Sequence, residues 1–159
     1  THVPLLLQGS QGLGLAPGYS SETPVCLEDI MPTFLEAVGV PAPEDLDGRS
    51  LLPLMRGECD RVREVLHSEH SPCYSQEQAF HALTDGRWKY IWRPLTGEEQ
   101  LFDLVADPGE CHDLSRTETD ATVHWRRRLI EQLRSRPEGF TDGERLVQPE
   151  SYSGIIPQR

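Results

Sequence analysis

The segment FHALTDGRWKYIWRPLTGEEQLFDLV (Phe80–Val105) decides the fold of this chain, because it contains three short strand-like runs separated by two turns. Asp85-Gly86 is the dipeptide typical of a two-residue type I′ turn, which predicts a hairpin with Leu83 opposite Trp88. Strand side chains alternate between the two faces of a sheet. The residues expected on the core face are Leu83, Trp88, Tyr90 and Trp92.

A further strand and a helix complete this part of the chain. The stretch REVLHSEH (Arg63–His70) precedes the hairpin and is a candidate strand, so four consecutive antiparallel strands are expected. Residues 120–134 carry Trp125, Leu129 and Leu133 at i, i+4 and i+8, which predicts an amphipathic helix. The sequence therefore predicts an α+β unit with a four-stranded antiparallel sheet and a C-terminal helix.

The N-terminal part has a different pattern. The continuous apolar run Val3–Leu7 predicts a short buried strand, and the apolar spacing from Asp29 to Val38 predicts a helix that ends at Gly39. The chain enters the apolar run without a Met or a leader segment, so we expect its beginning to lie elsewhere in a larger protein.

Composition limits the partners. The 159 residues carry a formal net charge of -11 with a pI near 4.9, which argues against nucleic acid and anionic membranes. No apolar run approaches the roughly 20 residues that span a bilayer. The four cysteines form no CxxC pair, which argues against a zinc-thiolate site and leaves their redox state open. Oligomeric state and cellular compartment (cytoplasm, periplasm or exterior) also stay open.

The acid-rich stretch LFDLVADPGECHDLS (Leu101–Ser115) is the first candidate site. Asp107-Pro108-Gly109-Glu110 fits a type II turn, with Pro and Gly at the two central positions. The acidic side chains are then spread around a turn instead of converging. We therefore expect a structural role for Asp103, Asp107, Glu110, His112 and Asp113.

The run HSEH (His67–His70) is the second candidate. On a strand His67 and Glu69 share a face while His70 points away, so these three side chains do not suit one metal ion. A further ligand would have to come from elsewhere in the chain. The sequence alone assigns no metal ligand and no catalytic residue.

Four stretches occur in an order and spacing that resemble the C-terminal third of sulfatases in the alkaline phosphatase superfamily. They are PVCLEDIMPTFLEAVGVPAP (Pro24–Pro43), LDGRSLLPLMRG (Leu46–Gly57), LTDGRWKYIW (Leu83–Trp92) and EEQLFDLVADPGECHDLS (Glu98–Ser115). The initial THVPLLLQGS resembles the family's Arg-Val-Pro-Leu strand, with His2 in place of Arg. Asp113 stands where Asn is common. The resemblance covers residues 1 to about 135.

The resemblance implies an alkaline phosphatase-like α/β fold of which this chain is the C-terminal part. Residues 1–57 resemble the end of the large α/β domain. Residues 58–136 resemble the smaller subdomain, with its antiparallel sheet and C-terminal helix. Residues 137–159 are expected to form an extended tail.

The resemblance also implies where the chemistry lies. Sulfatases use a formylglycine, made in a Cys/Ser-x-Pro-x-Arg motif, beside a divalent cation that is usually Ca²⁺. None of the four cysteines has Pro two positions on together with Arg four positions on. The expected function is therefore that of the C-terminal part of a sulfuric ester hydrolase, partnered by its own N-terminal catalytic part, with Ca²⁺, formylglycine and the sulfate ester bound upstream.

Two alternatives stay open. One is a phosphonate or phosphate monoester hydrolase of the same superfamily, and the other is a non-catalytic interaction module. In the resembling family the small subdomain lies beside the catalytic cleft. The residues expected at the rim of the substrate pocket are His2, Glu69 and His70.

Overall fold

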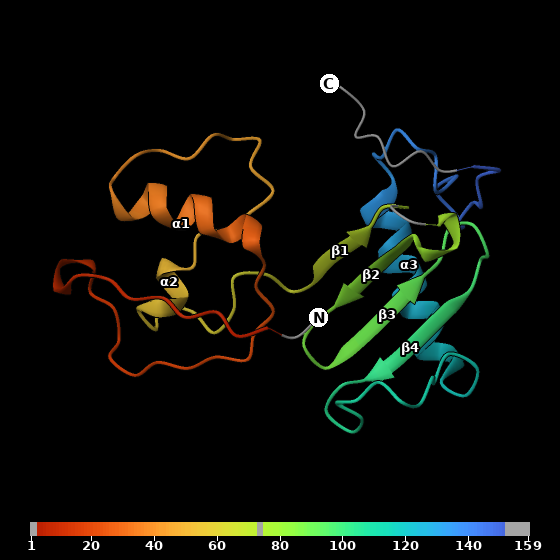
Figure 1. Ribbon diagram of the computed structural model, residues 1–159, viewed down its shortest axis with the longest axis horizontal. Coiled ribbons are helices and arrows are strands. Elements are labelled where there is room, and N and C mark those ends of the chain that lie inside the picture. The colour runs from red at the N-terminus through yellow and green to blue at the C-terminus, as the bar shows by residue number, and fades with distance from the viewer. Residues whose placement is uncertain (1–2, 73–74, 152–159) are drawn as a thin grey trace. The chain divides into compact units, whose positions relative to one another are not determined.

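The computed structural model describes residues 3–72 and 75–151, and the contacts within the chain divide it into two compact units, Thr1–Glu64 and Val65–Arg159 (Figure 1). The first unit carries the helices α1 (Ile30–Ala37) and α2 (Leu52–Met55). The second carries a sheet and the helix α3 (Thr119–Leu133). Among the described helices, none has the length and apolar character needed to cross a bilayer.

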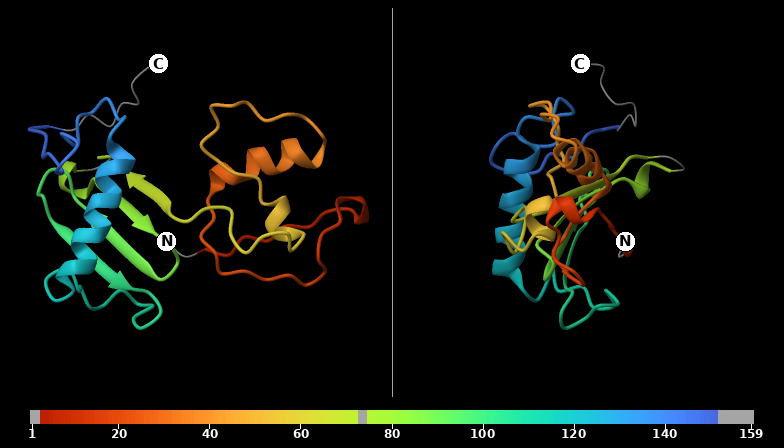
Figure 2. Two further views of the ribbon diagram at one scale, coloured as in Figure 1. Left: turned by 180° about the vertical axis from the view of Figure 1, so that it is seen from behind. Right: turned by 90° about the vertical axis from the view of Figure 1, so that its left-hand side faces the viewer.

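The sheet of the second unit is antiparallel throughout, and its strands follow one another in chain order. One face of the sheet is covered by α3 (Figures 1 and 2). This arrangement confirms the predicted four-stranded antiparallel sheet with a C-terminal helix. The strands are β1 (Leu66–His70), β2 (Phe80–Thr84), β3 (Trp88–Trp92) and β4 (Glu99–Asp103).

The hydrophobic core lies between this sheet and α3. The helix contributes the stripe predicted from its spacing, and the strands contribute the predicted core face, with Trp88 half-buried at its border. Phe140, which follows α3 and has no periodic pattern around it, is also fully buried, and its ring packs edge-on against Trp92. The largest buried members are Leu83, Tyr90, Trp92, Leu101, Trp125, Leu129, Leu133 and Phe140.

The expected register of the central hairpin was wrong. Leu83 pairs with Tyr90 instead of Trp88. Each residue of β2 therefore lies opposite a residue of β3 that is two positions further along the chain than expected. A shift of two keeps every side chain on its own face. The predicted core face therefore survives the error in register.

The reason for the shift lies in the turn. The Asp85 N–H donates to the Trp88 carbonyl at 3.3 Å, so Gly86 and Arg87 are the two central residues, and Gly86 takes a φ of 96°. The Asp85 side chain accepts the backbone N–H groups of Arg87 at 2.9 Å and Trp88 at 2.7 Å. Asp85 thus flanks the turn and bonds across it, so it does not occupy a central position.

The first unit is organised around a buried carboxylate. The predicted helix Asp29–Val38 is confirmed to within one residue at each end. Asp29 is fully buried and accepts the backbone N–H groups of Cys26 at 2.9 Å and Arg49 at 2.8 Å, and it forms an ion pair with Arg63. One side chain therefore joins three segments of this unit.

The predicted buried strand Val3–Leu7 was wrong. These residues form no strand, and Val3 and Leu6 are 76% and 91% exposed. A strand needs a neighbour to take its backbone hydrogen bonds. The described part of Thr1–Glu64 contains no strand that could serve as that neighbour.

Candidate functional site

The carboxylates of Leu101–Ser115 each have their own partner, in agreement with the expectation that these acids are spread around a turn. Among the described residues, they belong to no group of three or more side chains placed to hold one metal ion. The pairs are Asp103 with Arg87, Glu110 with Lys89, Asp107 with the backbone N–H of His112, and Asp113 with the backbone N–H groups of Leu101 and Ser115.

The turn within this stretch forms, but not as the expected type. The Asp107 carbonyl accepts the Glu110 N–H at 3.0 Å, which closes the turn. Gly109 lacks the positive φ that a type II turn requires at that position, and Glu110 takes a φ of 53° instead. The predicted type II geometry was therefore wrong.

A convergent group of side chains lies at the β1 edge of the sheet. His67 and Glu69 share one face of β1, as the alternation predicted, and His81 of β2 pairs directly opposite Glu69. The His67 Nε2 atom lies 3.2 Å from His81 Nδ1, which lies 3.5 Å from a Glu69 carboxylate oxygen. One ligand atom from each residue falls within 4.8 Å of both others. We call these three residues the His-His-Glu cluster.

The cluster has a buried floor and a more exposed rim. His81 is 1% exposed, and its ring stacks on His67 at 5.4 Å and on Trp92 at 6.0 Å between centroids. The Glu69 side chain is 34% exposed and forms an ion pair with Arg136 at 2.9 Å. Glu69 therefore exposes one side of the cluster to solvent, whereas the His81 side chain is held in place by its contacts in the hydrophobic core.

Burial makes both imidazoles harder to protonate. It lowers the pKa of His67, although the nearby Glu69 carboxylate opposes this shift and the positive charge of Arg136 adds to it. Burial likewise lowers the pKa of His81 to about 3, with contributions from His67 and Arg136. Neutral imidazoles each carry one nitrogen lone pair, which is the form that binds metal ions.

Sequence reasoning found two members of this cluster and missed His81. The signal it lacked was the β1–β2 pairing, which brings His81 opposite Glu69, 12 positions away along the chain. His70 stacks on Phe80 outside the cluster, with a centroid distance of 5.7 Å. His2 lies outside the described residues.

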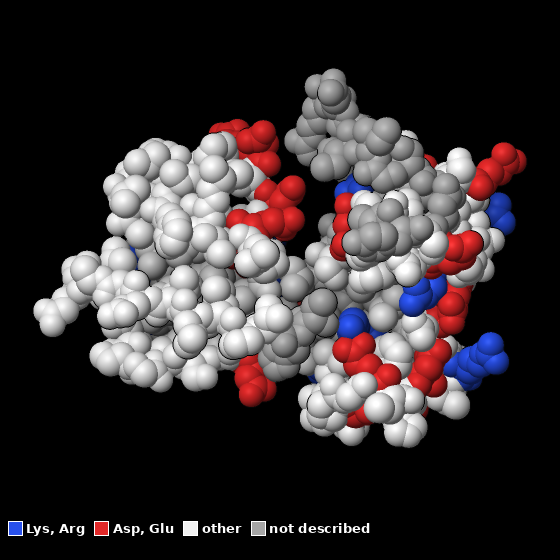
Figure 3. Space-filling model, in the orientation of Figure 1, with Lys and Arg blue, Asp and Glu red and all other residues white. Residues whose placement is uncertain are grey.

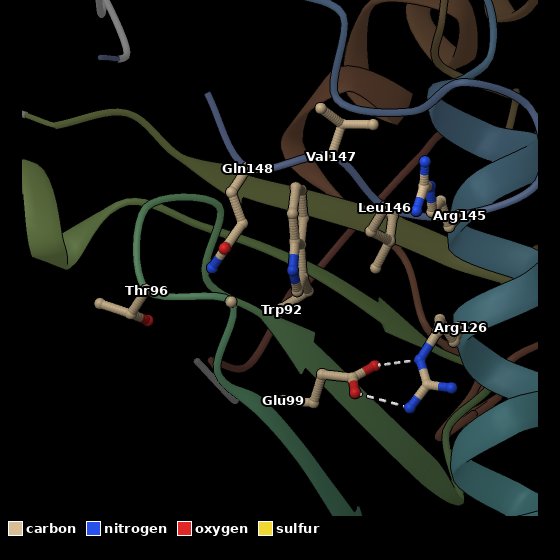
Figure 4. A pocket seen from close by; sticks show the side chains of 9 residues that line it. Trp92, Thr96, Glu99, Arg126, Arg145, Leu146, Val147 and Gln148 are labelled. Atoms are coloured by element: carbon tan, nitrogen blue, oxygen red, sulfur yellow. Dashed lines mark hydrogen bonds and ion pairs between the residues drawn. The ribbon is translucent and has the colours of Figure 1, made fainter. Parts of the chain in front are cut away.

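A shallow cleft of about 470 Å³ lies beside β4 and α3 (Figure 4). Its central charged pair is Glu99 with Arg126, joined by two hydrogen bonds of 2.6 Å each, and the Tyr90 hydroxyl also donates to Glu99. Both charged groups are thus engaged in tying α3 to the sheet. The cleft offers no free catalytic group among these three residues.

The comparisons with known proteins identify the family. Residues 1–137 match the family described as N-sulphoglucosamine sulphohydrolase, C-terminal. An arylsulfatase of Clostridium perfringens is 36% identical over 77% of this chain and 25% of its own length. Human arylsulfatase K is 37% identical over 72% of this chain and 22% of its own length.

The fold is shared with solved structures as well. A phosphonate monoester hydrolase from Silicibacter pomeroyi superposes with a TM-score of 0.62 and 25% identity, over 76% of this chain and 27% of that one. The chain spans about a quarter of the length of the relatives that it matches. By the match across both of its units, this chain belongs to the C-terminal domain family of the sulfatases, within the alkaline phosphatase superfamily.

Proposed function

We propose that this chain serves as the C-terminal part of a sulfuric ester hydrolase, in which it completes the fold and borders the substrate pocket. The observation that carries the proposal is the family match over residues 1–137, which spans both compact units. The catalytic residues then belong to the upstream part that makes up the rest of the relatives' length. That part is the main partner of this chain.

The surface of the first unit supports a large partner. A groove along α1 is lined by apolar side chains, and Met31, Phe34 and Val38 are 57%, 59% and 73% exposed. Figure 3 shows few charged side chains over this part of the unit. Contiguous exposed apolar surface of this kind marks an interaction site. We assign it to the upstream α/β part of the same protein.

The proposed cofactors, a divalent cation such as Ca²⁺ and a formylglycine, also belong upstream. Ca²⁺ takes six to eight oxygen ligands, whereas the carboxylates of Leu101–Ser115 are engaged with separate partners. The His-His-Glu cluster offers two nitrogen atoms and does not fit Ca²⁺. When bound, the cation and the gem-diol of formylglycine supply charge stabilisation and the nucleophile. No step of that chemistry is assigned to the described residues.

Activity assays test this proposal. The 159-residue chain should not hydrolyse an aryl sulfate in the presence of Ca²⁺, whereas the full-length protein that contains it should. Phe34→Glu in the full-length protein should lower the yield of active enzyme, because a charge would enter the apolar groove. Turnover by the isolated chain would contradict the proposal, and so would full activity of Phe34→Glu.

The same assay separates the alternatives. The solved phosphonate monoester hydrolase shares the fold, so the ratio of kcat/KM for an aryl sulfate to that for a phosphonate monoester decides between the two ester classes. A full-length protein that hydrolyses neither ester would favour the interaction module.

The rim role of His2, Glu69 and His70 is the finer part of the proposal. A rim residue contacts parts of the substrate remote from the ester, so it affects substrate discrimination more than the bond-breaking step. Ala substitutions in the full-length enzyme should therefore change the ratio of kcat/KM between a bulky sulfate ester and a small aryl sulfate. Equal losses for both substrates, or no losses, would reject the rim role.

A further inference from the structure

The His-His-Glu cluster brings three groups with nitrogen or oxygen lone pairs close together. Two imidazole nitrogens lie 3.2 Å apart, so one of them carries the proton of that hydrogen bond. The Glu69 carboxylate, 3.5 Å from His81 Nδ1, is an acceptor only when ionised. The arrangement therefore concentrates lone pairs at one point.

The separations match the ligand spacing around a small divalent metal ion. Zn–N and Zn–O bonds of about 2.0–2.1 Å place neighbouring tetrahedral ligands about 3.3–3.5 Å apart. His81 Nδ1 lies 3.2 Å from His67 Nε2 and 3.5 Å from the Glu69 carboxylate, and one ligand atom from each residue lies within 4.8 Å of the other two. The third separation, between His67 and the Glu69 carboxylate, is up to 4.8 Å. A movement of up to about 1.4 Å, shared between the half-buried His67 and the partly exposed Glu69, would bring it to the tetrahedral ligand spacing.

The neighbours of the cluster suit a metal site. Arg136 donates a hydrogen bond to one Glu69 carboxylate oxygen at 3.2 Å and forms an ion pair with the other at 2.9 Å, and a carboxylate with these contacts keeps further lone pairs. Ligating carboxylates are commonly held by such outer partners. Arg136 is also paired with Glu138 at 2.7 Å, which offsets its charge beside the site. The stacked His81 ring is fixed by Trp92.

We propose that His67 Nε2, His81 Nδ1 and the Glu69 carboxylate form a binding site for Zn²⁺ at the β1 edge of the small subdomain. Two nitrogens and one carboxylate oxygen form a donor set typical of zinc sites that keep a fourth position for water or another ligand. The partly exposed rim at Glu69 leaves room for that fourth ligand. Arg136 acts as a positioning residue that holds the carboxylate. The site does not depend on the sulfatase function of the parent protein.

Calorimetry on the untagged 159-residue chain, freed of metals by a chelator, tests the site. Titration with Zn²⁺ should give one ion per chain at the cluster. The variants His67→Gln and Glu69→Gln should each weaken binding by about tenfold or more, since each removes one ligand while keeping a polar side chain of similar size. His124→Gln, an exposed histidine on α3, is the matched control and should bind as the wild type does.

Cobalt spectroscopy supplies a second readout. Co²⁺ in the site should give the visible absorption of a low-coordinate nitrogen and oxygen environment, without the near-ultraviolet band of thiolate ligands that Cys26, Cys59 or Cys111 would produce. The melting temperature should rise with Zn²⁺ concentration in the wild type and not in the two ligand variants.

Three results of the zinc and cobalt experiments would overturn the proposal. They are the absence of Zn²⁺ binding by the folded wild type, unchanged affinity in both ligand variants, and a Co²⁺ spectrum dominated by thiolate. Binding of Ca²⁺ in place of Zn²⁺ would also reject it, because Ca²⁺ does not select imidazole ligands. Folding of each variant is checked by tryptophan fluorescence, so loss of binding cannot be mistaken for loss of structure.

Discussion

Truncating Phe140 should strongly destabilise the second unit. The side chain is fully buried, and its ring lies 5.9 Å from Trp92 and 4.8 Å from His81 between centroids. Phe→Ala in a core costs about 3–5 kcal/mol, from the lost transfer energy and the cavity left behind. For a unit of this size each kcal/mol lowers Tm by about 4–8 °C. Phe140→Ala should therefore lower Tm by about 12 °C or more.

The assay follows from the distribution of tryptophans. All three lie in Val65–Arg159, so tryptophan fluorescence during urea unfolding of the whole chain reports that unit. Phe34→Ala is the matched control, because it removes the same atoms from a side chain that is 59% exposed and belongs to the other unit. The control should change the free energy of unfolding of the second unit by less than about 0.5 kcal/mol.

A loss below about 1 kcal/mol for Phe140→Ala, with an unchanged urea m-value, would refute this reasoning. It would mean that residues after α3 form a tail that adds nothing to the core. A loss of the expected size makes Phe140 a part of the small subdomain, although no periodic pattern marks it in the sequence.

Three further predictions concern the turn and the buried ion pair. Gly86→Val should destabilise the sheet by about 1 kcal/mol or more in the same fluorescence assay, because φ at Gly86 is 96°. Asp29→Asn should expose the helix α1 in hydrogen exchange, since Arg63 would keep a buried charge without its partner, at a cost of about 3–5 kcal/mol. Burial raises the pKa of Asp29, but hydrogen bonds from Arg63, Arg49 and Cys26 outweigh it and hold that pKa below its ordinary value. The stabilisation is therefore complete above the ordinary pKa near 4 and is lost as the pH falls below it, which hydrogen exchange of α1 between pH 5 and pH 2 would show.

Helices and sheet faces were predictable because short-range periodicity determines them. The apolar spacing of α1 and α3 located both helices to within one residue at each end. The core face of β2 and β3 followed from alternation alone. The hairpin register did not, because the Asp85 side chain bonds to two backbone N–H groups across the turn, and this local interaction moved the turn by one residue.

The run Val3–Leu7 shows a different limit. An apolar run can serve as a buried strand only where another strand accepts its backbone hydrogen bonds, and the described residues of the first unit contain no strand. The sequence contained the apolar residues but not the neighbour. The apolar pattern therefore indicated that the segment could form a strand, but it could not show whether a neighbouring strand is present to pair with it.

The His-His-Glu cluster depends on which face of β1 packs against the core, and the sequence does not determine this. Strand β1 has His67 and Glu69 on one face and Leu66, Ser68 and His70 on the other, so its apolar pattern does not identify the core side. Nine residues separate β1 from β2, too many for the two-residue turn that would fix their pairing from the sequence. In the structure, His67 and Glu69 lie on the face of the sheet that α3 covers. Glu69 forms an ion pair with Arg136, which follows α3, and His67 contacts His81 of β2. Polar side chains are stable inside a layer only when such partners are present. The site thus arises from long-range contacts, and metal titration of the two ligand variants examines those contacts directly.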